Sequence, residues 1–448
     1  MSKILLKNAT LVCPSSIIRK DLLIEDDKIA KIDRDISDAQ AKVIDCKEHL
    51  VMPGLIDAHV HFREPGMDKK GTIASESRAA VLGGVTSYMD MPNTNPPTLS
   101  YRRVQEKKAI AARNSLANYA FYLGASTDNL EDIKKAPVND IAGIKVYMGS
   151  TTGNLLVDDQ NYLYKLFDQS PCIIAAHCED NSIIARHYAI YKERYGDKIP
   201  IVAHSSIRSR DCCYESSKLA IELALATKAK LHIMHISTRD ELELLKPHAN
   251  NTVKDRPISA EACIPHLYFS DSDFINLGGY IKCNPAVKRE YDRLAIARAV
   301  AQGILTTVGT DHAPHERELK ELKNYDKCPS GIPSVQFSLL VLLELFTRHE
   351  ISLEDVVRAS SYNVAQRFDI KGRGAIEEGN YADLVVASLT DNTVVRQEDI
   401  ASKCGFSPFT GHRFTSRILH TIVSGRHVVE NGRIIDETPG QALEFDRT

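Results

Sequence analysis

Hydrophobic and polar positions alternate with a period of two near both ends of the chain. Residues 21–25 and 28–32 read as short strands, and Asp26-Asp27 between them has turn chemistry. The same strand character returns after about residue 375, at 382–387 and 419–423. We therefore expect residues 1–52 and 376–448 to complete each other as one small β-sandwich domain.

Between these segments, short apolar runs alternate with longer amphipathic stretches such as 73–82, 211–227 and 292–302. The candidate strands are 55–59, 85–91, 117–123, 143–148, 172–177, 230–235, 257–262 and 305–309. Alternation of strands and helices predicts a parallel sheet with crossover helices, hence an α/β fold. Eight such units favour a (β/α)8 TIM-type barrel over residues 53–375 rather than an open sheet.

Composition and charge limit the classes of function that this chain can have. The formal net charge is −3 and no basic block stands out, which argues against a nucleic-acid partner. The ten cysteines lack C-x-x-C spacing, as expected of reduced thiols in the cytoplasm. The N-terminus lacks the apolar core of a signal peptide, and no apolar run approaches the roughly 20 residues of a membrane span. We expect a cytoplasmic protein with no membrane partner.

Candidate chemistry gathers where the predicted barrel strands end, which is where barrel enzymes place their active sites. The residues at these ends are His59 and His61, Lys145, His177, His235 and Asp311. A single histidine of this kind is usually a hydrogen-bonded structural residue. Four histidines and an aspartate, however, form a nitrogen and oxygen ligand set typical of Zn²⁺, and they are too many for one tetrahedral ion. The pattern predicts two metal ions.

Lys145 lies between Ile144 and Val146 in the fourth predicted strand. If these two neighbours pack against helices, Lys145 points into the barrel. The bland alternative is a lysine that snorkels or forms an ion pair. Burial lowers a lysine pKa, and a neutral amine can react with CO₂ to give a carbamate. The two carbamate oxygens could then bridge the two metals.

Asp311 could simply cap a helix. As a metal ligand beside a bridging hydroxide it could instead accept the proton of that hydroxide, which is the general-base role in metal-assisted hydrolysis. Two Zn²⁺ carry more charge than the carbamate, Asp311 and the hydroxide remove. The residual positive charge, to which Arg63 adds, would favour an anionic substrate.

Two segments carry a family resemblance. Residues 57–66, Asp-Ala-His-Val-His-Phe-Arg-Glu-Pro-Gly, and residues 309–315, Gly-Thr-Asp-His-Ala-Pro-His, are similar to two signatures of the amidohydrolase superfamily. Within it, nearly the whole chain resembles the dihydroorotases of the larger bacterial type. The resemblance implies that His59 and His61 hold one Zn²⁺ and that His177 and His235 hold the other. It also implies that carboxylated Lys145 and a hydroxide bridge the ions, and that Asp311 is both a ligand and the proton shuttle.

The resemblance also implies a set of substrate-binding residues: Arg63, Asn93, Asn284, His315, Ser330 and Gly331. An arginine grips a carboxylate with two parallel hydrogen bonds, and asparagine matches amide groups. The chain departs from the pattern of the family at two places. Many bacterial relatives carry Asp where this chain has Lys145. Cys328-Pro329 precede Ser330 and Gly331 where the family often has Phe before the Gly.

The function implied is the reversible cyclisation of N-carbamoyl-L-aspartate to L-dihydroorotate, a step of de novo pyrimidine biosynthesis. One alternative is a dihydropyrimidinase/hydantoinase or an allantoinase; Arg63 discriminates, because a neutral hydantoin has no carboxylate for it to hold. Another is a non-catalytic scaffold, but proteins of that kind lose metal ligands and none is missing here. The resemblance further suggests a homodimer.

Overall fold

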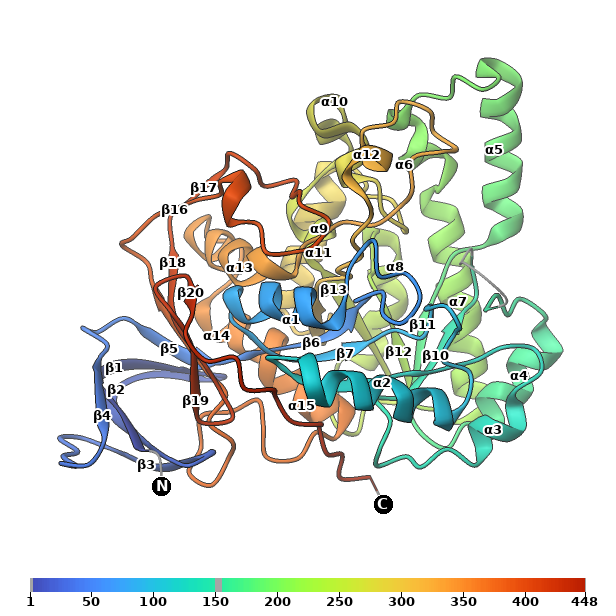
Figure 1. The fold of residues 1–448 in the computed structure, drawn as a ribbon. Coiled ribbons are helices and arrows are strands. Elements are labelled where there is room, and N and C mark those ends of the chain that lie inside the picture. Colours follow the sequence, from blue (N-terminus) through green and yellow to red (C-terminus); the bar gives the residue numbers. More distant parts are fainter. Residues whose placement is uncertain (1–2, 150–154, 448) are drawn as a thin grey trace.

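The computed structural model describes residues 3–149 and 155–447. Residues 1–2 and 448, at the two ends of the predicted terminal domain, lie outside the described ranges. A barrel surrounded by helices occupies the centre of the molecule, and a sheet built from both chain ends lies on one side of it (Figure 1). The expected α/β fold class is confirmed.

The barrel strands follow one another in the predicted order, and β8 and β9 together make the third. They are β6 (Leu55–Val60), β7 (Val85–Asp90), β8 (Asn118–Phe121), β9 (Leu123–Gly124), β10 (Ile144–Tyr147), β11 (Ile174–His177), β12 (Leu231–Ile233), β13 (Ile258–Cys263) and β14 (Thr307–Gly309). All pairings among them are parallel. The last strand meets the first where the His61 N–H donates to the His312 carbonyl oxygen at 2.7 Å, so the barrel closes.

Helices cover the outside of this barrel (Figure 1). The main ones are α1 (Ile73–Leu82), α2 (Tyr101–Asn114), α3 (Leu130–Lys134), α4 (Gln160–Gln169), α5 (Asn181–Tyr195), α7 (Arg210–Thr227), α8 (Arg239–Leu245), α11 (Glu290–Ala301), α13 (Ser338–Thr347), α14 (Leu353–Val357) and α15 (Asn363–Phe368). Shorter helices are α6 (His204–Ile207), α9 (Ile264–Tyr268), α10 (Phe274–Leu277) and α12 (Arg317–Lys320).

Local chemistry explains where several helices begin. Thr72 before α1 and Thr238 before α8 each accept the N–H of the residue three positions on, and that residue's side chain bonds back to the cap. Successive side chains of a strand point to opposite faces, so every second residue of a barrel strand can face the helices. In β10 these residues are Ile144 and Val146, which share an apolar cluster with Phe167 of α4.

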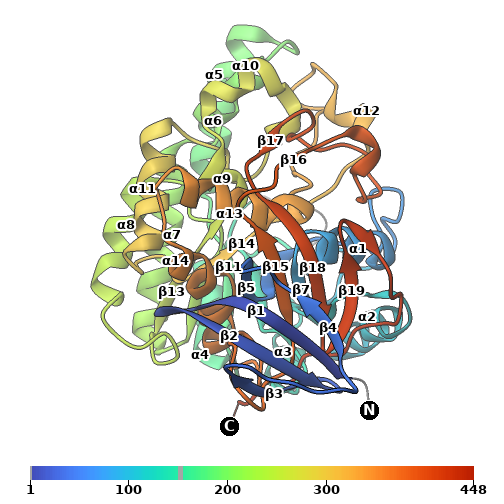
Figure 2. The ribbon, with the colours of Figure 1, turned by 90° about the vertical axis from the view of Figure 1, so that its left-hand side faces the viewer.

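The terminal sheet joins the two ends of the chain. Its strands are β1 (Lys3–Cys13), β2 (Ser16–Glu25), β3 (Lys28–Asp33), β4 (Lys42–Asp45), β5 (Leu50–Pro53), β15 (Leu384–Ser388), β18 (Arg417–Val423), β19 (Arg426–Glu430) and β20 (Arg433–Ile434). The junction is the antiparallel pair β15–β5, in which Val386 faces Val51. In Figure 2 the blue N-terminal strands cross the red C-terminal strands in front of the barrel. The domain boundaries at 52/53 and 375/376 stay a prediction.

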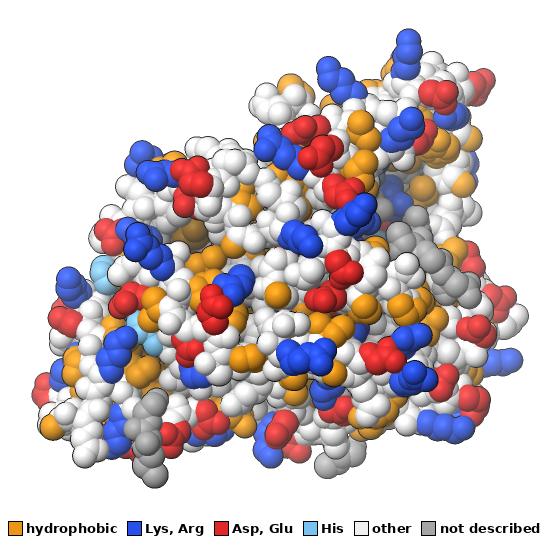
Figure 3. Space-filling model, in the orientation of Figure 1, with side chains coloured by type: hydrophobic (Ala, Val, Ile, Leu, Met, Phe, Trp, Pro, Cys, Tyr) orange, Lys and Arg blue, Asp and Glu red, His pale blue; other side chains and the backbone are white. Residues whose placement is uncertain are grey.

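Charged side chains of both signs are interspersed on the face shown in Figure 3, without a basic stripe. Within the described ranges, no helix is long and apolar enough to cross a membrane.

Candidate active site

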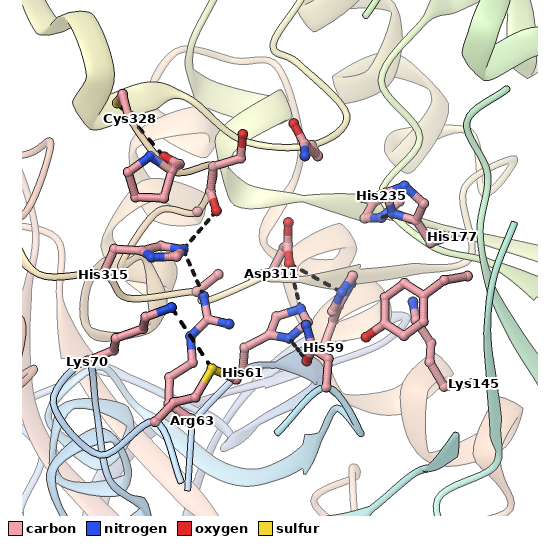
Figure 4. A pocket seen from close by; sticks show the side chains of 18 of the residues that line it. His59, His61, Arg63, Lys70, Lys145, His177, His235, Asp311, His315 and Cys328 are labelled. Carbon is pink, nitrogen blue, oxygen red and sulfur yellow. Dashed lines mark hydrogen bonds and ion pairs between the residues drawn. The ribbon is translucent and has the colours of Figure 1, made fainter. Parts of the chain in front are cut away.

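All twelve predicted site residues line one pocket at the carboxyl ends of the barrel strands (Figure 4). The pocket has a volume of about 470 Å³, which suits a small-molecule substrate. Met67, Lys70, Tyr147, Ala313, Asp326, Cys328 and Pro329 complete its lining.

His59, His61 and Asp311 form the first ligand group. His59 lies within β6, His61 just beyond it, and Asp311 two residues after β14. The Asp311 Oδ1 atom lies 3.3 Å from His59 Nε2 and 3.2 Å from His61 Nε2. Asp311 adopts φ = 47°, in the left-handed region that an aspartate enters at some cost. The three donor atoms converge as the ligands of one ion would.

His177 and His235 form the second group. His177 ends β11 and His235 follows β12 by two residues, with φ = 38°. His177 Nδ1 lies 2.8 Å from His235 Nε2, and the His235 ring is centred 5.3 Å from the His59 ring. The two ligand groups are therefore neighbours, as two metals bridged by a shared ligand require.

Lys145 projects inward from β10, away from the helix-facing Ile144 and Val146, and lines the same pocket (Figure 4). Its side chain is fully buried, and its amine has no hydrogen-bond partner within residues 3–149 and 155–447. Burial lowers the pKa of Lys145 to about 8. An orphaned buried amine that loses its proton this easily fits the carbamate expected from the sequence.

The protonation states suit metal binding. Burial lowers the pKa of His61 to about 4, and it also lowers those of His177 and His235, so these imidazoles are neutral and offer lone pairs. Burial alone would raise the pKa of the Asp311 carboxyl, but His59 and His61 beside it hold that pKa below its usual value. The donor set thus fits divalent metal ions.

Two carboxylates that the sequence reasoning missed each contact one ring nitrogen of a ligand histidine. Glu261 of β13 places Oε1 2.7 Å from His59 Nδ1. Glu179 places Oε2 3.0 Å from His177 Nε2 and also forms an ion pair with Arg208. A carboxylate behind a metal-binding imidazole fixes its orientation and tautomer. In the sequence, only their positions could have pointed to them: Glu261 lies inside an apolar strand, and Glu179 follows one by two residues.

Asp57, two residues before His59, was also given no role by the sequence reasoning. Its Oδ1 accepts the backbone N–H groups of His59 and Thr310 at 3.1 Å each. This carboxylate ties the first barrel strand to the segment that carries Asp311. Farther along that segment, the His312 ring lies 2.8 Å from Glu76 of α1.

Asn93 and Asn284 face the pocket in different ways. Asn93 Oδ1 lies 2.6 Å from His61 Nδ1, so this amide supports a metal ligand and leaves its NH₂ group for a substrate. Asn284 Oδ1 is buried without a partner in the described part of the chain. An unpartnered buried amide oxygen is costly and fits an absent N–H donor such as a ring amide.

Arg63 and His315 form the other side of the pocket (Figure 4). Arg63 Nε donates to the Pro314 carbonyl oxygen at 3.1 Å, and its Nη2 lies 3.2 Å from His315 Nε2. His315 Nε2 in turn lies 2.9 Å from the Ser330 carbonyl oxygen. The Gly331 N–H already donates to the Lys282 carbonyl oxygen at 2.8 Å, so a substrate contact from Gly331 would use its carbonyl group.

A sequence model described as the Amidohydrolase family matches residues 50–428. The chain belongs to the amidohydrolase family. Among relatives of this amidohydrolase, a protein named dihydroorotase from Methanosphaera stadtmanae is 30% identical, covering 97% of this chain and 98% of that protein. A protein named allantoinase from Bacillus velezensis is 31% identical, covering 96% and 94%. The solved L-hydantoinase (dihydropyrimidinase) of Arthrobacter aurescens superposes with a TM-score of 0.93 at 28% identity, covering 99% of this chain and 100% of that one.

These comparisons confirm the expected enzyme class, a metal-dependent cyclic amidohydrolase. They do not separate the three substrate types that the relatives' names carry. The substrate type therefore has to be inferred from the side chains that line the pocket.

Proposed function

We propose that this amidohydrolase is a dihydroorotase, which interconverts N-carbamoyl-L-aspartate and L-dihydroorotate in pyrimidine biosynthesis. The observation that carries the proposal is Arg63. Its side chain is buried, and no carboxylate in residues 3–149 or 155–447 forms an ion pair with it. A buried guanidinium without an anion is unfavourable. A substrate carboxylate would complete the site.

The competing substrates lack this group. Hydantoin and dihydrouracil carry no carboxylate, and allantoin is likewise uncharged, so each would leave Arg63 unpaired. Relatives named dihydroorotase support the assignment, although relatives named allantoinase match at similar identity. The assignment of the substrate therefore rests on the charge of the pocket rather than on the relatives' names.

Two zinc ions held by the histidines, Asp311 and carboxylated Lys145 would supply an activated water and polarise the ring carbonyl. The chain's own residues do the rest. Arg63 holds the substrate carboxylate, and Asn284 Oδ1 accepts a ring N–H, which together orient the scissile amide. The Asp311 carboxylate takes up a proton from the attacking water and delivers it to the leaving ring nitrogen. In the cyclising direction Asp311 returns that proton by the reverse route.

The supporting carboxylates keep this arrangement rigid. Glu261 orients His59 and Glu179 orients His177, so the lone pairs that face the pocket do not need to reorganise. Asn93 does the same for His61 through its amide oxygen. A homodimer stays a prediction.

The test is an assay of L-dihydroorotate hydrolysis with and without a chelator, on wild type and on Asp311→Asn. We expect the chelator to abolish activity and added Zn²⁺ to restore it. Asp311→Asn should lose on the order of 10²–10⁴-fold in kcat, whereas the exposed Asp391→Asn should match wild type. Activity that survives both metal removal and Asp311→Asn would refute the proposal.

A further inference from the structure

Lys70 lines the catalytic pocket, yet the site described so far gives it no task. It lies in the segment between β6 and α1, where the Met67 N–H donates to the Arg63 carbonyl oxygen and the Lys70 N–H to the Met67 carbonyl oxygen. These two turns fold the chain back on itself. Figure 4 shows the Lys70 side chain beside those of Arg63 and His315, on the side of the pocket away from Lys145.

Among the described residues, no carboxylate forms an ion pair with the Lys70 amine. The one hydrogen bond that this amine forms within the described ranges is to the Met67 sulfur, 3.9 Å away, which is a weak acceptor. Two other lysines of this chain, both more deeply buried, have partners. Lys107 forms an ion pair with Asp90, and Lys282 donates to the Tyr325 and Cys328 carbonyl oxygens at 2.7 and 2.6 Å.

The surroundings of Lys70 favour the binding of an anion. The side chain is half-buried, and burial together with the charge of Arg63 lowers its pKa, opposed by the weaker effect of the Glu316 carboxylate. Two cations therefore lie on one side of the pocket, and neither forms an ion pair with a carboxylate of the described residues. Like charges at close range are unfavourable unless an anion binds both.

We propose that Lys70 is a second cationic contact for the substrate carboxylate, acting beside Arg63, and thereby a determinant of specificity for anionic substrates. The inference deepens the proposed function and rests on it. A carboxylate has two oxygens with about four lone-pair sites, so it can accept from a guanidinium and an ammonium together. Arg63 would set the orientation of the carboxylate, and Lys70 would add a compact charge.

The carboxylate takes no part in the bond change, so its contacts are equally strong in the ground state and the transition state. Loss of such a contact raises KM and leaves kcat nearly unchanged. The loss should also spare substrates that have no carboxylate. These two signatures separate a contact with the carboxylate from a general structural role.

The experiment compares Lys70→Met and Lys70→Arg with the matched control Lys69→Met, whose lysine is adjacent and exposed. For zinc-loaded enzyme, KM and kcat are measured for L-dihydroorotate and for the uncharged dihydrouracil. We expect Lys70→Met to raise KM for dihydroorotate about tenfold or more, as loss of one charge-assisted hydrogen bond does, with kcat within about twofold. Lys70→Arg should retain most of the affinity, and Lys69→Met should match wild type.

The outcomes separate the two hypotheses. If wild type hydrolyses dihydroorotate but Lys70→Met behaves like Lys69→Met, the role of Lys70 is wrong and the proposed function stands. The role of Lys70 is equally wrong if Lys70→Met loses kcat on both substrates or loses zinc, since that indicates a structural role. If wild type fails to hydrolyse dihydroorotate, both are wrong.

Discussion

Glu261 Oε1 lies 2.7 Å from His59 Nδ1, and both side chains are buried. This contact leaves the other ring nitrogen of His59 facing Asp311, 3.3 Å away. The two residues stand on the first and the seventh strands of the barrel. Closure of the barrel thus fixes the orientation of a metal ligand.

Glu261→Gln should weaken metal binding at the His59 and His61 group. The amide can still accept the His59 N–H, but it lacks the charge that makes the imidazole a stronger ligand, and comparable changes cost about 10–100-fold in affinity. Competition with a chelator measures this directly. The exposed Glu243→Gln is the control. Equal zinc retention in the two variants would show that Glu261 does not support the ligand.

Carboxylation of Lys145 is testable apart from activity. Enzyme reconstituted with zinc and ¹³C-bicarbonate should give a carbamate carbon signal by NMR, and Lys145→Met should not. Lys107 is almost as deeply buried, but its amine forms an ion pair with Asp90, so it should stay unmodified. A signal that persists in Lys145→Met would assign the carbamate elsewhere.

Lys282 and Lys320 hold the segment that carries Ser330 and Gly331. Lys320 Nζ donates to the Lys282 and Pro329 carbonyl oxygens at 3.0 and 2.9 Å. Lys320→Met leaves the Pro329 carbonyl oxygen without its N–H donor and removes one of the two donors of the Lys282 carbonyl oxygen, at a cost of about 1–3 kcal/mol. We expect faster proteolysis within residues 316–331 and a higher KM for dihydroorotate. The exposed Lys323→Met should show neither effect; if the two variants are cleaved equally fast, Lys320 does not anchor the segment.

The terminal sheet should lose stability in mild acid. Burial and the charges of Lys42 and His420 lower the pKa of His427 to about 4, opposed by Glu430. The unfolded value is about 6.5, so between these two pH values the unfolded chain binds more protons and stability falls as the pH falls. From about pH 7 to pH 5 we expect a loss on the order of 1 kcal/mol. In His427→Phe this part of the pH dependence should disappear, whatever the variant's overall stability. An unchanged slope in denaturation experiments would contradict the assignment.

Short-range pattern was enough to predict the barrel. Alternation of apolar runs with amphipathic stretches located each of the eight strands, and Asp311 and His235 were placed at strand ends although the strands stop two residues earlier. The six predicted metal-binding residues share one pocket because parallel strands deliver their carboxyl ends to one rim, whereas Asn284, Ser330 and Gly331 reach it from loops.

Contacts between distant strands could not be predicted from pattern. Glu261 and His59 are 202 positions apart, and a glutamate in a buried strand could equally well have paired with a lysine or arginine. The unpaired state of Arg63 and Lys70 is likewise a property of the folded pocket, since both residues have carboxylates close by in the sequence at Glu64 and Asp68.

If Arg63 and Lys70 hold the substrate carboxylate, the charge of this pocket selects an anionic ring substrate. The most direct measurement is kcat/KM of the zinc-loaded wild type for L-dihydroorotate, dihydrouracil, hydantoin and allantoin, side by side. We expect kcat/KM for dihydroorotate to exceed that for each uncharged substrate by about 100-fold or more, because the uncharged rings leave the buried Arg63 without its anion. Faster opening of dihydrouracil, hydantoin or allantoin would contradict it.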